Sequence, residues 1–267
     1  MNDDLARAFA FMRGGDMRGT DERPFRFGTA IFTPELPNRQ DSNLLYLDRL
    51  DADVTTAALC EESERLFRAA GRRSQVLVFP DADLAERHLP GFADWEVHRS
   101  VVMVKRRAPE TTADTASVVE VDEAALRPAR RAQLASYPWA TPELTTQLLE
   151  AKVLLRRWQS VRCFARLQNG EVASYTDLYA AGSEAQVEDV ATLPQYRGRG
   201  FAKGVVMRAV EEAEADGADF VFLVAMEDDW PRELYARLGF DVVGRYVKVF
   251  NVVASEASDQ RRDDEPA

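Results

Sequence analysis

Cysteine and histidine are both scarce in this chain of 267 residues, which contains two of each. Cys60 and Cys163 stand alone and lack the spacing of metal ligands, so a disulfide framework is excluded and no metal site is predicted. We expect both thiols to be small residues of a core. His88 and His98 lie away from every motif described below, and we assign neither of them a catalytic role.

Long hydrophobic runs are also missing. No apolar run approaches the roughly 20 residues that cross a bilayer, so we expect no membrane partner. The first 20 residues carry charged side chains that a secretory signal lacks, among them Asp3, Asp4 and Arg7. These features predict a soluble, cytoplasmic protein.

Positive charge is in deficit. The chain has 34 basic and 45 acidic residues, for a net charge of −11. This balance argues against nucleic acid as a partner, because nothing offsets the repulsion of phosphates, and it would steer a cationic amine favourably.

The chain is long enough for two modest cores, since 46% of its residues are hydrophobic. Residues 108–116 are polar and contain a proline, so they predict a linker between a first domain at 1–107 and a second at 117–253. The polar and charged end of the chain, 254–267, predicts a disordered tail.

Apolar periodicity predicts a mixed α/β protein. In the first half the expected strands are 28–32, 44–47, 75–79 and 95–104, with a helix at 57–70. In the second half the expected strands are 117–121, 159–168, 171–180, 186–192, 220–225 and 242–252, with helices at 123–134, 142–155 and 201–214 and a further helix that has Pro231 in its first turn and stops at Gly239. Asn169-Gly170 between two of these strands is a strong hairpin signal.

The most informative segment is 195–203, which reads QYRGRGFAK and joins a predicted strand to a predicted helix. Free N–H groups and the positive end of a helix dipole form an anion site in such a turn, and glycines let the main chain approach a phosphate. Phe201 follows the last glycine where a P-loop needs lysine, and Lys203 stands where a dinucleotide fingerprint needs glycine.

The spacing R-x-x-G-x-A of Arg197, Gly200 and Ala202 instead resembles the pyrophosphate loop of the GCN5-related N-acetyltransferase (GNAT) family. Downstream, residues 234–240 read LYARLGF and resemble the closing signature L-Y-x-x-x-G-F of that family. The two motifs have the expected order and separation, and the resemblance covers roughly residues 117–250. It implies the GNAT fold, a mixed α/β sheet.

The first half looks like a degenerate copy of the same fold, in a tandem arrangement. Its segment 89–97 echoes the Leu238-Gly239-Phe240 region, but no phosphate loop lies between Leu47 and Val54 and no tyrosine precedes its Gly-Phe pair. This domain should therefore not bind coenzyme in the family manner. An unrelated α+β domain is the alternative.

The resemblance implies acetyl-CoA as co-substrate and no metal. The diphosphate would lie on the N–H groups of Gly198, Arg199, Gly200, Phe201, Ala202 and Lys203, with charge added by Arg199 and Lys203. Val190, Ala191 and Thr192 would hold the pantetheine arm and supply the oxyanion donor where two strands splay apart. Many members carry asparagine where this chain has Asp228, which loses an amide donor towards the coenzyme. Capping the next helix is the alternative role of Asp228.

Tyr235 is the preferred general acid for the departing thiolate, the alternative being a tyrosine that only packs on the sheet. Under period-two alternation Glu188 shares a strand face with Val190 and Thr192, so it is the candidate base, the alternative being a surface or salt-bridged glutamate. Asp189 should face the opposite side unless a bulge changes the register.

The sequence thus predicts an N-acetyltransferase that moves an acetyl group from acetyl-CoA to a primary amine by direct attack in a ternary complex. The acceptor would be a small-molecule or protein amine, and the protein a monomer or homodimer. A non-catalytic acyl-CoA-binding or sensing module is the alternative.

Overall fold

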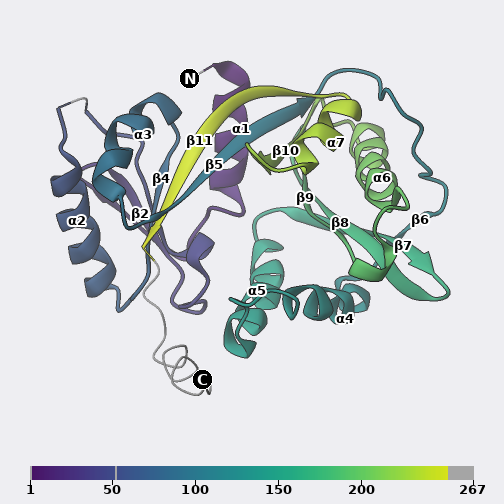
Figure 1. The fold of residues 1–267 in the computed structure, drawn as a ribbon, viewed down its shortest axis with the longest axis horizontal. Coiled ribbons are helices and arrows are strands. Elements are labelled where there is room, and N and C mark those ends of the chain that lie inside the picture. The colour runs from purple at the N-terminus through teal and green to yellow at the C-terminus, as the bar shows by residue number, and fades with distance from the viewer. Residues whose placement is uncertain (1, 52, 252–267) are drawn as a thin grey trace, which may run out of the picture. The chain divides into compact units, whose positions relative to one another are not determined.

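The computed structural model describes residues 2–51 and 53–251, which form two compact units (Figure 1). The larger unit comprises 2–18 and 99–246, and the smaller unit comprises the described residues of 19–98 together with 247–251. The division into consecutive domains at 108–116 stays a prediction, and the predicted tail at 254–267 lies outside the described residues.

The strands of the larger unit have the order β11-β5-β10-β9-β8-β7-β6, to which β11 (Phe240–Asn251) contributes its residues 240–246. The other strands are β5 (Glu96–Lys105), β6 (Val118–Val121), β7 (Ser160–Gln168), β8 (Glu171–Ala181), β9 (Glu184–Thr192) and β10 (Phe220–Met226). From β5 to β6 in this order, the β9–β10 pair is parallel and the other pairs are antiparallel. Asn169 and Gly170, with φ of 53° and 81°, form the predicted tight turn between β7 and β8.

Helices lie on both faces of this sheet (Figure 1). The helices are α1 (Asp3–Gly14), α4 (Glu123–Leu134), α5 (Pro142–Leu155), α6 (Phe201–Ala215) and α7 (Pro231–Arg237). One face of β9 buries Ala185 and Val187 against the apolar stripe of α6, which includes Val206 and Val210. The other face carries polar side chains towards α4 and α5, and that face holds the site described below.

The strands of the smaller unit have the order β1-β2-β3-β4-β11. Its strands are β1 (Asp21–Phe25), β2 (Gly28–Phe32), β3 (Leu44–Tyr46), β4 (Gln75–Phe79) and the last residues of β11 (Phe240–Asn251), with helices α2 (Thr56–Ala69) and α3 (Ala82–His88). A separate core gathers Phe67, Leu77, Phe79 and Phe92.

The predicted mixed α/β class is confirmed, and α4 and α5 have the predicted bounds. Three elements were not predicted: α1, β1 and α3. β1 has the sequence DERPF, in which Pro24 and the charges obscure any strand pattern. A proline is tolerated there because β1 is an edge strand with mostly exposed side chains.

Candidate active site

Strands β9 and β10 pair only at their beginning and then separate. Their parallel pairing runs from Glu184 with Phe220 to Gln186 with Phe222. Beyond this point a pocket of about 240 Å³ opens between the strands. It is lined by Val187, Glu188, Asp189, Val190, Val224, Ala225, Met226, Pro231 and Tyr235. The predicted splay beside Val190 is thus present in the structure.

A β-bulge lies in β9 at the edge of this pocket. The pairing with β8 places Tyr175 opposite Ala191 and Asp177 opposite Glu188, so β9 has one residue too many between these pairs. Asp189 has a φ of 54°, a left-handed conformation that is uncommon outside glycine.

The bulge changes the register, which is the condition under which Asp189 is not expected to face the side opposite Glu188. The Asp189 carboxylate lies 3.5 Å from Arg130 Nε and 3.5 Å from Lys152 Nζ, and these cations come from α4 and α5 on the other face. The extra residue turns the chain so that Glu188 and Asp189, although consecutive, both direct their carboxylates to that face.

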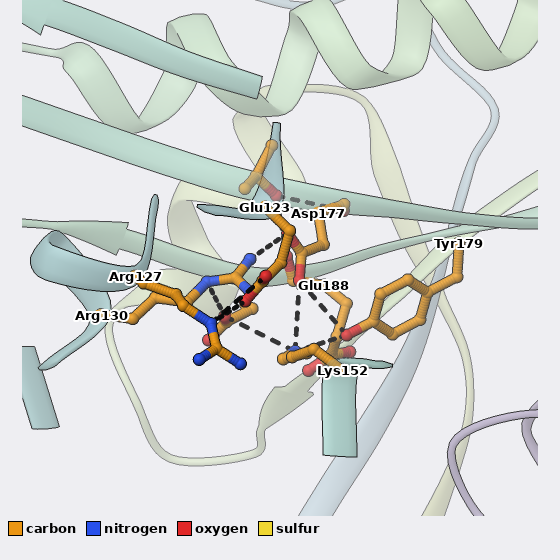
Figure 2. Close-up of polar contacts among 9 residues, drawn as sticks. Glu123, Arg127, Arg130, Lys152, Asp177, Tyr179 and Glu188 are labelled. Carbon is orange, nitrogen blue, oxygen red and sulfur yellow. Dashed lines mark hydrogen bonds and ion pairs between the residues drawn. The ribbon is translucent and has the colours of Figure 1, made fainter. Parts of the chain in front are cut away.

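A network of buried charges surrounds Asp177, which is fully buried on β8 (Figure 2). Its carboxylate accepts a hydrogen bond from Arg130, lies 3.2 Å from Lys152 Nζ and accepts from the Tyr179 hydroxyl at 3.4 Å. Lys152 also donates to that hydroxyl. Burial lowers the pKa of Lys152, but Asp189, Tyr179 and Asp177 outweigh burial and hold it well above its usual value.

Glu188 stands next to this network with a different electrostatic environment. Burial and then the negative charge of Asp16 raise the pKa of Glu188 to about 7, against the opposing effect of Lys152. Gln186 Nε2 donates to its carboxylate at 2.7 Å. A half-buried carboxylate that titrates near neutrality and lines a pocket is suited to accept a proton.

Tyr235 lies in the wall of the same pocket. It is the buried residue of the short helix α7, with 8% of its surface exposed, and its ring lies edge-on to Phe240. Burial, then Glu188 and Asp229, raise its pKa above the usual value for tyrosine. The phenol is therefore protonated at neutral pH and able to donate a hydrogen bond. Within the described chain no group hydrogen-bonds its hydroxyl.

The turn before α6 has the backbone that its glycines predict. Gly198 and Gly200 have φ of 74° and 76°, and Gly200 caps α6 without any side-chain hydrogen bond. From Gly198 to Lys203, no backbone N–H has a hydrogen-bond partner among the described residues. A row of free donors at a helix start, in an exposed turn, fits a diphosphate.

The side chains of this turn differ in their contacts. Arg197 donates from Nε to the carbonyl oxygen of Thr192 at 3.2 Å, which fastens the turn to the end of β9. Arg199 reaches the carbonyl of Gln195 at 3.5 Å and lies in the exposed part of the turn. Phe201 packs its ring beneath the guanidinium of Arg166. Ala202 and Lys203, in the first turn of α6, are half-buried.

Replacing Gly200 by alanine is expected to weaken coenzyme A binding about 5- to 30-fold, because a left-handed φ strains any other residue by about 1–2 kcal/mol. The added methyl would also lie 3.0 Å from Lys203 Cε. Titration calorimetry with coenzyme A measures the effect. Gly217→Ala is the matched control, because Gly217 has a φ of 90° with open space around it, at the opposite end of α6. An equal loss in both variants contradicts a local role for Gly200.

Asp228 lies in the exposed turn between β10 and α7. The proposed capping role is wrong, because α7 begins after Trp230 without a side-chain cap and Asp228 makes no hydrogen bond within the described chain. Asp229 instead accepts from the N–H of Trp230 at 2.8 Å. A coenzyme contact of Asp228 stays a prediction.

Sequence reasoning missed the cluster of Arg130, Lys152, Asp177 and Tyr179. One signal was present: Asp177 interrupts an apolar strand, and Lys152 interrupts the apolar end of α5. A charge in a run that is otherwise buried indicates a paired charge, because an unpaired one is too costly to bury. Which residues pair could not be read from the sequence.

Two further properties concern the described part of the chain as a whole. Across residues 2–51 and 53–251, no helix combines the length and apolar character needed to span a bilayer. The same residues contain no group of three or more histidine, cysteine, aspartate or glutamate side chains placed to hold a metal ion.

Comparison with protein families gives one match. Residues 126–240 match the model of the acetyltransferase (GNAT) family. The matched segment contains the β9–β10 pocket, the turn before α6 and Tyr235. No functionally curated protein matches the sequence.

Several solved structures are similar in fold. A GCN5-related N-acetyltransferase from Kribbella flavida has a TM-score of 0.66 at 18% identity, over 95% of this chain and 98% of that one. A conserved protein of unknown function from Staphylococcus epidermidis has a TM-score of 0.66 at 12% identity, over 88% and 94%. A tandem GNAT protein from the clavulanic acid biosynthesis pathway reaches 0.50 at 15% identity, over 74% and 70%.

Proposed function

Residues 126–240 form a domain of the GNAT acetyltransferase family, and from this premise we propose that the protein moves an acetyl group from acetyl-CoA to a primary amine. Acyl transfer from an acyl-CoA is the general reaction of the family. The choice of acetyl, the amine acceptor and direct attack in a ternary complex are our proposal. The observation that carries it is the pocket between β9 and β10, which has a carboxylate of pKa about 7 and a protonated phenol in its walls.

The turn before α6 would bind the diphosphate of the co-substrate. The unpaired N–H groups from Gly198 to Lys203 donate to its oxygens, and the positive end of α6 with Arg199 and Lys203 adds charge. Acetyl-CoA supplies a thioester whose carbonyl carbon accepts the amine. Val190, Ala191 and Thr192 would pair with the pantetheine arm along the free edge of β9, where β10 has moved away.

Glu188 would accept the proton of the incoming amine. An amine with a pKa of about 10 is mostly protonated at neutral pH, so a base, acting directly or through water, makes the nucleophile. The N–H of Val190, at the bulge, would donate to the oxygen that gains negative charge during attack. Its position on the pocket wall next to Glu188 suits it to that role.

Tyr235 would donate its proton to the departing thiolate. The conjugate thiol has an ordinary pKa of about 8.5, so a phenol hydrogen bond assists departure without being indispensable. The buried phenol retains its proton until the thiolate forms, because burial and the nearby carboxylates disfavour the phenolate.

Tyr235→Phe is expected to lower turnover about 100-fold, at the lower end of what general acids contribute, with unchanged coenzyme A affinity. Thiol release from acetyl-CoA measures turnover, and calorimetry measures binding. Tyr196→Phe is the control, because the Tyr196 hydroxyl donates a hydrogen bond to the exposed Glu171, outside the pocket. A Tyr235→Phe variant with wild-type turnover removes the tyrosine from the mechanism.

Thiol release over a panel of amines tests the function itself. The panel should include small primary amines, amino acid derivatives and peptides with free α- or ε-amines. Amine-dependent thiol release supports the proposal. Tight coenzyme binding without release for any amine would instead indicate a non-catalytic acyl-CoA-binding module.

A further inference from the structure

We propose that Arg130 and Lys152 act as a two-cation clamp on Asp189 and so hold the β9 bulge that aims Glu188 and the Val190 N–H into the pocket. Asp189 is then a positioning residue, because it acts through its neighbours and has no role at the reacting atoms. The role of Glu188 in this inference rests on the proposed function. The clamp does not, because it concerns only the contacts that hold the bulge in place.

The bulge needs an anchor because its backbone is unfavourable. A left-handed φ at a residue other than glycine costs about 1–2 kcal/mol, and the extra residue interrupts the ladder of β8 and β9. Asp189 is one of two such residues in the described chain, the other being Asn169 in a hairpin turn that favours this conformation. No comparable turn type accounts for Asp189 in mid-strand.

The anchor runs through side chains from β8 to β9. Asp177, opposite Glu188 in the ladder, holds Arg130 and Lys152, and both cations then lie 3.5 Å from the Asp189 carboxylate. Glu123 also lies 4.0 Å from Arg130 Nη1, so several carboxylates supply the counter-charge that lets Arg130 and Asp177 stay buried, whereas the Asp189 side chain is 35% exposed. Figure 2 shows these cations converging next to Glu188.

One atom of the cluster supports this assignment. Arg130 is 3% exposed, and its buried Nε makes no hydrogen bond, although it lies at ion-pair distance from Asp189. Asp189 pairs with Arg130 at this Nε, whereas Glu123 and Asp177 pair with its Nη1 and Nη2 atoms. Moving Asp189 away would leave this part of a buried guanidinium without its counter-charge, so the bulge and the cluster stabilise one another.

Hydrogen exchange tests the clamp independently of any reaction. Asp189→Asn tolerates the left-handed φ but removes the carboxylate, and Lys152→Met removes one cation. Amides 188–191 should exchange about tenfold faster in both variants, because the local opening becomes easier. Lys152→Arg keeps the charge and should restore slow exchange.

Arg162→Met is the matched control. Arg162 also joins several carboxylates, Glu120, Glu212 and Asp216, but in the described structure none of them contacts the clamp residues. Its loss should leave the exchange of amides 188–191 unchanged. Equal acceleration in this control, or no acceleration in Asp189→Asn, overturns the clamp.

Kinetics test the positioning. The Asp189→Asn and Lys152→Met variants should lose about 10- to 100-fold in kcat, since small displacements of catalytic groups have effects of this size, while the KM for acetyl-CoA stays within about twofold. Faster exchange with wild-type kcat contradicts a positioning role. Wild-type protein without amine-dependent thiol release refutes the proposed function, and the exchange data still decide the clamp.

The pH profile separates positioning from general loss of stability. The groups interacting with Glu188 are Asp16, Lys152, Asp189, Gln186, Tyr179 and, across the pocket, Tyr235. Asp189 raises the pKa of Glu188 and Lys152 lowers it. The acidic limb of kcat/KM should therefore move to lower pH in Asp189→Asn and to higher pH in Lys152→Met. A shift in one common direction contradicts these assignments.

Discussion

Replacing Glu188 by glutamine is expected to lower turnover about 10²- to 10⁴-fold, the range that a general base contributes. Glutamine keeps the size of the side chain and an oxygen that accepts from Gln186 Nε2. The loss therefore reports the missing proton acceptor. Thiol release at saturating acetyl-CoA measures it, and coenzyme affinity should not change.

The same variant makes a prediction about pH. With a pKa of about 7, Glu188 is protonated and inactive as a base below neutrality and ionised above it. Wild-type kcat/KM should fall about tenfold per pH unit below 7, in addition to the slope from the acceptor amine. In Glu188→Gln, assayed with the same acceptor, only the acceptor slope should remain.

Glu184→Gln is the control for this prediction. It makes the same chemical change on the same strand, but Glu184 pairs with Arg7 at 2.7 Å and is not among the pocket residues. Its turnover should stay within about twofold of wild type. A Glu188→Gln variant that retains its activity and its acidic limb assigns the proton acceptor to another group.

Removing the carboxylate of Asp177 should give the largest loss of stability. Asp177→Ala leaves Arg130 and Lys152 buried beside an excess of positive charge, and breaking a buried pair in this way costs about 3–5 kcal/mol. Urea unfolding followed by tryptophan fluorescence measures the change. Trp139, Trp158 and Trp230 all lie in the larger unit, so the signal reports mainly on it.

An exposed ion pair provides the comparison. Glu64 pairs with Arg68 one helical turn away on α2, and both side chains are more than half exposed. Glu64→Ala should cost no more than about 0.5 kcal/mol. If Asp177→Ala costs equally little, the buried cations have found other partners or water, and the cluster does not stabilise the fold.

Most of the fold could be predicted because apolar periodicity is strong where elements face a core. The stripe of α6 and the alternation of β9 up to Val187 are local properties of the chain. The unpredicted α1 and β1 are different, because their placement depends on partners distant in sequence. Phe11 of α1, for example, packs edge-on against Phe222 of β10.

The residues of the candidate site likewise fall into those that the sequence reveals and those that it does not. The turn before α6 and Tyr235 belong to short motifs, so their residues could be named from the sequence. The clamp could not be predicted, because its residues come from four elements and meet only when the sheet forms. These residues are Arg130, Lys152, Asp177 and Asp189. The bulge itself depends on register, which alternation alone does not encode.

The position of strand β5 determines where the protein can be truncated. Its residues Ser100–Val104 cover one edge of β10 in antiparallel pairing. A truncated version starting at residue 117 would expose the backbone of FVFLVAM, a long apolar edge of the kind that recruits other chains. A well-behaved fragment for crystallisation or NMR thus has to begin upstream of residue 100, however autonomous the C-terminal motifs look.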